Sequence, residues 1–126
     1  MEAADLAGRR ILIVEDEFLL ALELERRVRA AGGAVVGPVG SVERALARVR
    51  DDHLDGALLA VNLNERPITP VVEALRERGV PFILVTAYGD AAPPDEPALH
   101  GAPLMTTGTA TAELHRAMMR AFGGAP

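Results

Sequence analysis

Hydrophobic positions along the chain alternate between two patterns: short unbroken apolar runs, and longer stretches with helical spacing. The unbroken runs are rich in β-branched and aliphatic residues, which predicts strands buried on both faces of a parallel sheet. We expect five such strands, at 10–15, 34–39, 56–61, 81–86 and, in shorter form, around Leu104. Pro38 ends the second run and cannot donate to a sheet ladder, so we expect this strand near a sheet edge.

Between the strands, apolar residues recur at intervals of three and four, which predicts amphipathic helices at about 17–31, 42–50, 69–79 and 110–122. We expect Ser41 to cap the second helix, and Thr69, followed by Pro70, to cap the third. The expected buried stripes, in chain order, are Leu20, Leu24, Val28 and Ala31; Val42, Ala45, Leu46 and Val49; Val71, Val72 and Leu75; and Leu114, Ala117, Met118 and Ala121.

This alternation of strands and helices predicts an α/β fold with a doubly wound five-stranded parallel sheet. Right-handed crossovers favour the flavodoxin-like strand order 2-1-3-4-5. The segment from 87 to 103 contains Pro93, Pro94, Pro97 and Pro103, so we expect the fourth helix to be short or absent. We find no internal repeat or domain boundary and expect a single domain over residues 1–126, with its core at about 9–122.

Composition narrows the function classes. The chain has 126 residues, 49% of them hydrophobic, and a net charge of −5, which disfavours nucleic acid as a partner. The absence of cysteine excludes disulfides, zinc thiolate sites and cysteine nucleophiles. The first ten residues are polar and acidic, and no apolar run is long enough to span a membrane. We therefore expect a cytoplasmic protein without a signal peptide or a membrane segment.

Candidate chemistry gathers at the carboxyl ends of the expected strands, where open α/β sheets place their sites. The first strand ends in Glu15 and Asp16, the third in Ala60 and the fourth in Thr86. Adjacent acids at a strand end are typical of a Mg²⁺ site. The alternative is a solvated acid pair that is stabilised by the dipole of the following helix.

Three runs, "ILIVEDE", "DGALLAVNL" and "PFILVTAYG", together with the final helix, resemble the receiver domain of bacterial two-component response regulators. The resemblance covers about residues 9–122. The third run is similar to that of the alphaproteobacterial single-domain receivers with a "FAT GUY" signature. The resemblance as a whole implies a CheY-like fold and a role in phosphorelay signal transduction, without enzymatic activity of the chain's own.

The resemblance also assigns roles to single positions. Ala60 falls on the phosphoacceptor aspartate, and Thr107 falls on the lysine that pairs with the phosphoryl group. Thr86 falls on the switch hydroxyl, and Leu104 falls near the switch aromatic. Because a methyl group offers no lone pair, Ala60 cannot act as the nucleophile of aspartyl phosphorylation. The resemblance therefore implies a degenerate pseudo-receiver with no catalytic residue. Natural divergence and engineered loss of the acceptor both remain open.

A metal site would be weak. Glu15 and Asp16 fall on the acid pair that holds Mg²⁺ in the family, and the backbone carbonyl of Asn62 is a third candidate ligand. With two carboxylates instead of three, we expect binding at roughly millimolar concentration or weaker. No cofactor is required.

We expect the protein to act by docking on a histidine kinase, a phosphotransfer protein or another receiver. Phe18, Leu19 and Leu22 widen the apolar arc of the first helix. We interpret them first as core residues and alternatively as a partner-binding surface, to which Tyr88 could add. The sequence leaves open a homodimer, the partner's identity, the signal and the pathway.

Two other functions stay open. One is an active phosphorelay receiver with a displaced acceptor, such as Asp55 or Asp90. Asp55 counts against this, because it lies at the start of the third strand, at the wrong end of the sheet. The other is a module that binds a nucleotide or another anion in the vacated pocket, although the rim carries Glu15 and Asp16 and no obvious cation.

Overall fold

A computed structural model describes residues 6–63, 66–86, 102–106 and 111–123. Five strands form one sheet in the order β2-β1-β3-β6-β7, and every neighbouring pair is parallel. Counted along this sheet alone, the order is 2-1-3-4-5, which confirms the flavodoxin-like prediction and places β2 at an edge. The strands are β1 (Arg10–Val14), β2 (Ala34–Val39), β3 (Gly56–Ala60), β6 (Phe82–Thr86) and β7 (Leu104–Thr106).

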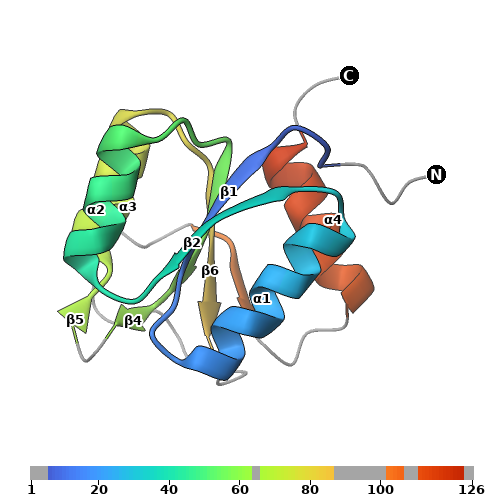
Figure 1. Ribbon diagram of the computed structural model, residues 1–126, viewed down its shortest axis with the longest axis horizontal. Helices are drawn as coiled ribbons and strands as arrows, with labels where there is room; N and C mark the ends of the chain where they lie inside the picture. The colour runs from blue at the N-terminus through green and yellow to red at the C-terminus, as the bar shows by residue number, and fades with distance from the viewer. Residues whose placement is uncertain (1–5, 64–65, 87–101, 107–110, 124–126) are drawn as a thin grey trace.

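Helices cover both faces of the sheet (Figure 1). α1 (Phe18–Ala30) and α4 (Thr111–Phe122) lie on one face, and α2 (Val42–Asp51) and α3 (Thr69–Glu77) lie on the other. Each pair closes a separate aliphatic core over alternate residues of the strands. The central strands are buried on both sides, as their unbroken apolar runs predict.

The start of α2 follows its sequence signal, and the start of α3 does not. Ser41 caps α2 as predicted, because its hydroxyl accepts a hydrogen bond of 3.1 Å from the backbone N–H of Arg44. Thr69 is the first residue of α3 instead of its cap, and Ile68 takes the cap position without a side-chain hydrogen bond. Ile68 is fully buried, so apolar packing holds the start of α3 where a polar cap was expected.

The buried face of α1 differs from the expected stripe. Ala21, Leu24 and Val28 are buried, whereas Leu20 is half-buried. Ala21 occupies the buried position in the first turns of α1, so its larger neighbours lie on the outer side of the helix. The interpretation of these neighbours as core is therefore wrong, since three large apolar side chains are exposed: Phe18, Leu19 and Leu22.

The end of α4 also differs, because Phe122 is buried and Ala121 only partly so. The reason lies at the start of β3. A methyl group built on Gly56 would lie 2.4 Å from the ring of Phe122, so the missing side chain of Gly56 makes room for that ring.

A two-stranded hairpin follows β3 and was not predicted. β4 (Asn62–Leu63) pairs antiparallel with β5 (Arg66–Pro67). The guanidinium of Arg66 donates a hydrogen bond to the carboxylate of Glu43 on α2 and lowers the pKa of that carboxyl. The segment after β3 is thus joined to the second helix.

Two further expectations concern the rest of the chain. The expectation that the fourth helix is short or absent concerns residues 87–101, which lie outside the described residues. None of the helices in the described part of the chain has the length and apolar character needed to cross a membrane.

Candidate functional site

The carboxyl ends of β1, β3 and β6 bring three of the expected positions to one edge of the sheet. Val14 pairs with Leu59 and Ala60 pairs with Val85, so the next position after β1, Glu15, lies beside Ala60. Thr86 follows Val85 at the end of β6 and pairs with Thr106 of β7. The register thus supports the expectation that Glu15, Ala60 and Thr86 share one edge.

Ala60 is buried, with 5% of its surface exposed, and it packs among aliphatic residues of the sheet. Its methyl group leaves no oxygen at the end of the central strand. Chemically, this position can neither attack a phosphoryl group nor ligate a metal through its side chain.

Glu15 is the only buried charged residue in the described part of the chain, with 8% of its surface exposed. One of its carboxylate oxygens accepts a hydrogen bond of 3.0 Å from the backbone N–H of Glu17. Burial raises the pKa of Glu15, the backbone hydrogen bond partly offsets this, and the neighbouring carboxyl of Asp16 raises the pKa further. A cation at this edge would favour the ionised form of Glu15.

The donors for a divalent cation are few. Asp16 is exposed beside Glu15, but the described residues contain no cluster of three histidine, cysteine or acidic side chains suited to a metal. Asn62 begins the β4–β5 hairpin and pairs with Pro67, and the placement of its side chain is not described. Two carboxylates fit a hard cation only in part, because Mg²⁺ sites gain affinity from each added charged ligand.

The remaining expected positions are spread out. Leu104 is partly buried and pairs with Leu84, two residues before Thr86 along β6, so it sits deeper in the sheet than the edge. Thr107, Tyr88 and Asp90 lie outside the described residues. Asp55 lies just before β3, at the opposite edge of the sheet from Ala60.

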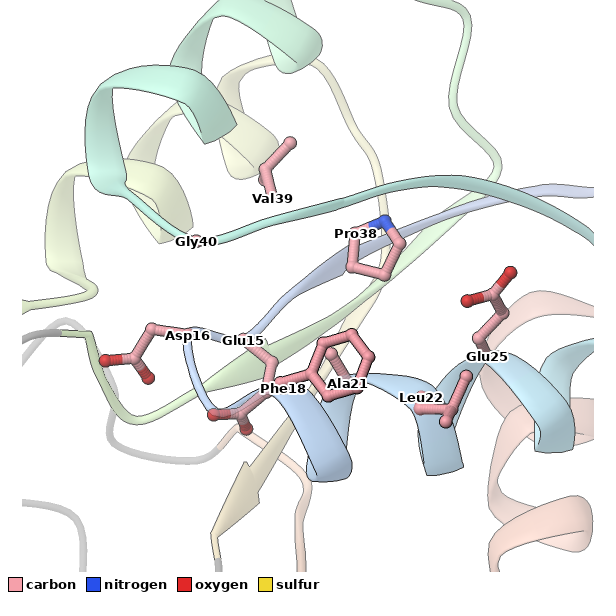
Figure 2. A pocket seen from close by; sticks show the side chains of 9 residues that line it. All are labelled: Glu15, Asp16, Phe18, Ala21, Leu22, Glu25, Pro38, Val39 and Gly40. Carbon is pink, nitrogen blue, oxygen red and sulfur yellow. The ribbon is translucent and has the colours of Figure 1, made fainter.

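Two of the three exposed apolar residues at the start of α1 line a groove that was not predicted. Phe18 and Leu22 form one side of a groove of about 430 Å³, and Pro38 and Gly40 at the end of β2 form the other (Figure 2). Glu15 and Asp16 lie at one end of this groove. Its only sequence signals are the surplus of apolar residues on α1 and the proline at the end of the edge strand.

Relatives of known class match this arrangement. The two-component response regulator PhoP of Pseudomonas aeruginosa is 35% identical over 83 residues, which are 64% of this chain and 36% of PhoP. The solution structure of SdrG from Sphingomonas melonis Fr1 is 36% identical, with a TM-score of 0.76, and the match covers 87% of this chain and 92% of SdrG. The chain belongs to the response-regulator receiver family.

A second solved structure agrees with the fold. The receiver domain of the sensor histidine kinase PA1611 from Pseudomonas aeruginosa PAO1, solved with magnesium in its active-site cleft, has the same fold. Its TM-score is 0.79 at 24% identity, and the match covers 94% of this chain and all of that domain. No protein-family model matches the chain. The chain spans between 33% and 40% of the length of the curated relatives that it matches.

The composition of this receiver adds one observation that the site itself does not show. All 13 of its basic residues other than histidine are arginines, so the chain contains no lysine. No segment, described or not, can therefore supply the lysine ammonium group that the family uses beside the acceptor.

Proposed function

We propose that this chain is a pseudo-receiver, which takes part in two-component signalling by docking on other proteins and does not accept a phosphoryl group at the end of β3. The observation that carries the proposal is Ala60, buried beside Glu15 at the edge where the family places its acceptor aspartate. Without an oxygen there, signalling depends on surface contact.

The surrounding chemistry supports this proposal. Phosphoryl transfer needs a nucleophile, a metal ion and cationic groups that stabilise the transferring charge. Ala60 removes the nucleophile, the absence of lysine removes one cationic group, and two carboxylates make a poor metal site. These losses are consistent with one another, because a buried lysine without its carboxylate would be an unpaired charge.

The alternatives of a displaced acceptor and an anion-binding module have less support. Asp55 accepts a hydrogen bond of 2.9 Å from the backbone N–H of Arg10, at the edge of the sheet far from Glu15, so it serves the fold. A nucleotide or another anion in the vacated pocket is disfavoured because Glu15 and Asp16, at the same end of the sheet as Ala60, are acidic.

The docking surface we propose is the start of α1. Phe18, Leu19 and Leu22 are exposed there, and burying them against a partner would remove apolar surface from water. The partner would be a histidine kinase, a phosphotransfer protein or another receiver. Neither enzymatic activity nor nucleic-acid binding is part of this proposal.

The test of this function is a phosphorylation assay. The purified chain is incubated with Mg²⁺ and acetyl phosphate, and its intact mass is measured beside a receiver that retains the acceptor aspartate. We expect the control to gain a phosphoryl group and this chain to gain none. A stoichiometric, acid-labile adduct on this chain would contradict the proposal, and peptide mapping would then locate the displaced acceptor.

A further inference from the structure

The groove between α1 and the end of β2 has an apolar middle and acidic ends. Figure 2 shows Phe18, Ala21 and Leu22 along α1, with Pro38 across from them. Glu25 lies at the far end of the groove, one turn beyond Ala21, and Glu15 and Asp16 lie at the near end. Acidic residues therefore lie at both ends of the groove, with hydrocarbon between them. At the near end Asp16 is the exposed acid, whereas the Glu15 carboxylate is buried and accepts a hydrogen bond from the backbone N–H of Glu17.

The charge of the groove has one sign. Its lining within the described residues contains three carboxylates and no arginine or histidine. Glu25 pairs with Arg29 at 2.8 Å, but Arg29 itself is not part of the lining. The arginines of α1 are confined to its second half, whereas the acids that line the groove are Glu15 and Asp16, just before the helix, and Glu25 within it.

The apolar middle is unusually open. Phe18 is 75% exposed and Leu22 is 42% exposed, although the chain has only three phenylalanines. An exposed phenylalanine ring next to carboxylates offers a cation both a π face and a counter-charge. Leu19 is 67% exposed on the same turn of α1 but does not line the groove, so exposure and groove lining can be separated by mutation.

We propose that this groove binds an arginine or lysine side chain of a partner protein, flanked in that partner by apolar residues. The aliphatic stem lies over Phe18 and Leu22, and the cationic head reaches the carboxylates. This inference rests on the proposed docking function and adds to it the chemical class of the docking segment.

Other occupants fit less well. An anion would meet only carboxylates. A bare metal ion would leave Phe18 and Leu22 exposed to water. A second copy that docked through its own α1 would bring arginines that are already paired, Arg26 and Arg27 with Glu23 and Arg29 with Glu25.

The probe is a blocked tripeptide, acetyl-Leu-Arg-Leu-amide, titrated into the ¹⁵N-labelled chain and followed by amide chemical shifts. Its matched control replaces arginine with citrulline, which has nearly the same shape and no charge. We expect saturable shifts at Phe18, Leu22 and Gly40, and affinity at least about fivefold higher for the arginine peptide. Raising the salt concentration should reduce this preference. Equal binding of the two peptides, shifts elsewhere in the chain, or no saturable shifts would overturn the proposal.

Two variants locate the site on the chain. Leu22→Ala should weaken the arginine peptide severalfold. Leu19→Ala should weaken it clearly less, since Leu19 belongs to the wider docking surface of α1 and does not line the groove. Equal losses in the two variants would overturn the assignment to the groove. So would a concentration-dependent dimer that Leu22→Ala abolishes, because the groove would then be occupied by a second copy.

Failure of this inference and failure of the proposed function give different results. A phosphoryl adduct in the mass assay removes the pseudo-receiver proposal and leaves the peptide titration unaffected. Absence of the adduct together with equal binding of the arginine and citrulline peptides keeps the pseudo-receiver and removes the cationic partner.

Discussion

Acidic residues have different surroundings at the two ends of the strands, the amino-terminal and the carboxyl-terminal edge of the central sheet. At the amino-terminal edge, Asp55 accepts a hydrogen bond from the backbone N–H of Arg10 and lies 3.2 Å from the ring of His53. The guanidinium of Arg10 in turn donates to the backbone carbonyl of His53 and lies 3.8 Å from Asp52. Acids and bases alternate here, and each contact joins the loop before β3 to the start of β1.

At the carboxyl-terminal edge, acid lies beside acid. Glu15 is buried and adjacent to Asp16, and its pKa is raised, whereas pairing with arginine lowers the pKa of Glu23 and of Glu43. Acids that pair with arginine thus have a lowered pKa. Glu15 has a raised pKa, so its ionised form destabilises the folded chain. Polar groups that stability does not explain are the ones most usefully tested for function.

The largest effect expected from this comparison is that of Ala60→Asp. A carboxylate at this buried position would lie beside Glu15, and repulsion with desolvation should lower the free energy of unfolding by about 2–4 kcal/mol at pH 7. Millimolar Mg²⁺ should recover much of the loss, since it would supply the missing counter-charge. Urea unfolding with and without Mg²⁺ measures both.

Ala60→Asn is the matched control, because it has nearly the same size and no charge. It should be less destabilised than the aspartate variant and insensitive to Mg²⁺. If both variants were as stable as the parent chain, Ala60 would not lie against Glu15. The comparison between the two edges would then be contradicted.

The sequence predicts some elements better than others, because their sequence signals differ in kind. Long apolar runs identify the strands within one residue at most ends, and Ser41 is identifiable as a cap because a serine just before a helical pattern is a local signal. Packing, by contrast, decided the start of α3 at Ile68. A strand of two residues such as β4 has no period to detect, so the hairpin could not be predicted.

For the site, the sequence placed Glu15, Ala60 and Thr86 at one edge, because the carboxyl ends of parallel strands converge. It did not reveal the groove. The groove depends on how α1 is rotated over the sheet, and the choice between Leu20 and Ala21 as the buried residue depends on side-chain volumes that periodicity does not contain.

The second expected effect is at the amino-terminal edge. Asp55→Ala removes the acceptor of the Arg10 amide and the partner of His53, and should lower the free energy of unfolding by about 1 kcal/mol. Asp55→Asn keeps an acceptor oxygen and should lose less. Mg²⁺ should change neither variant relative to the parent chain, and a Mg²⁺-dependent difference would mean that Asp55 contributes to a metal site.

The smallest expected effect is that of Glu15→Gln, and it has the opposite sign. Because the folded chain raises the pKa of Glu15 above its ordinary value of 4.5, the fold favours the protonated form. The stability that the protonated form contributes is fully present below the unfolded-state pKa and is lost as pH rises through the folded-state pKa.

At pH 7 without metal, Glu15→Gln should therefore be slightly more stable than the parent chain, and the gain should vanish near pH 4. Thermal unfolding from pH 4 to pH 8 measures this, with Glu73→Gln, an exposed acid on α3, as the control. Added Mg²⁺ should reverse the order at pH 7, because only the parent chain keeps both carboxylates. A parent chain that is more stable than Glu15→Gln at pH 7 without metal would show that the buried acid is compensated within the fold, and the contrast between the two edges would then be one of position only.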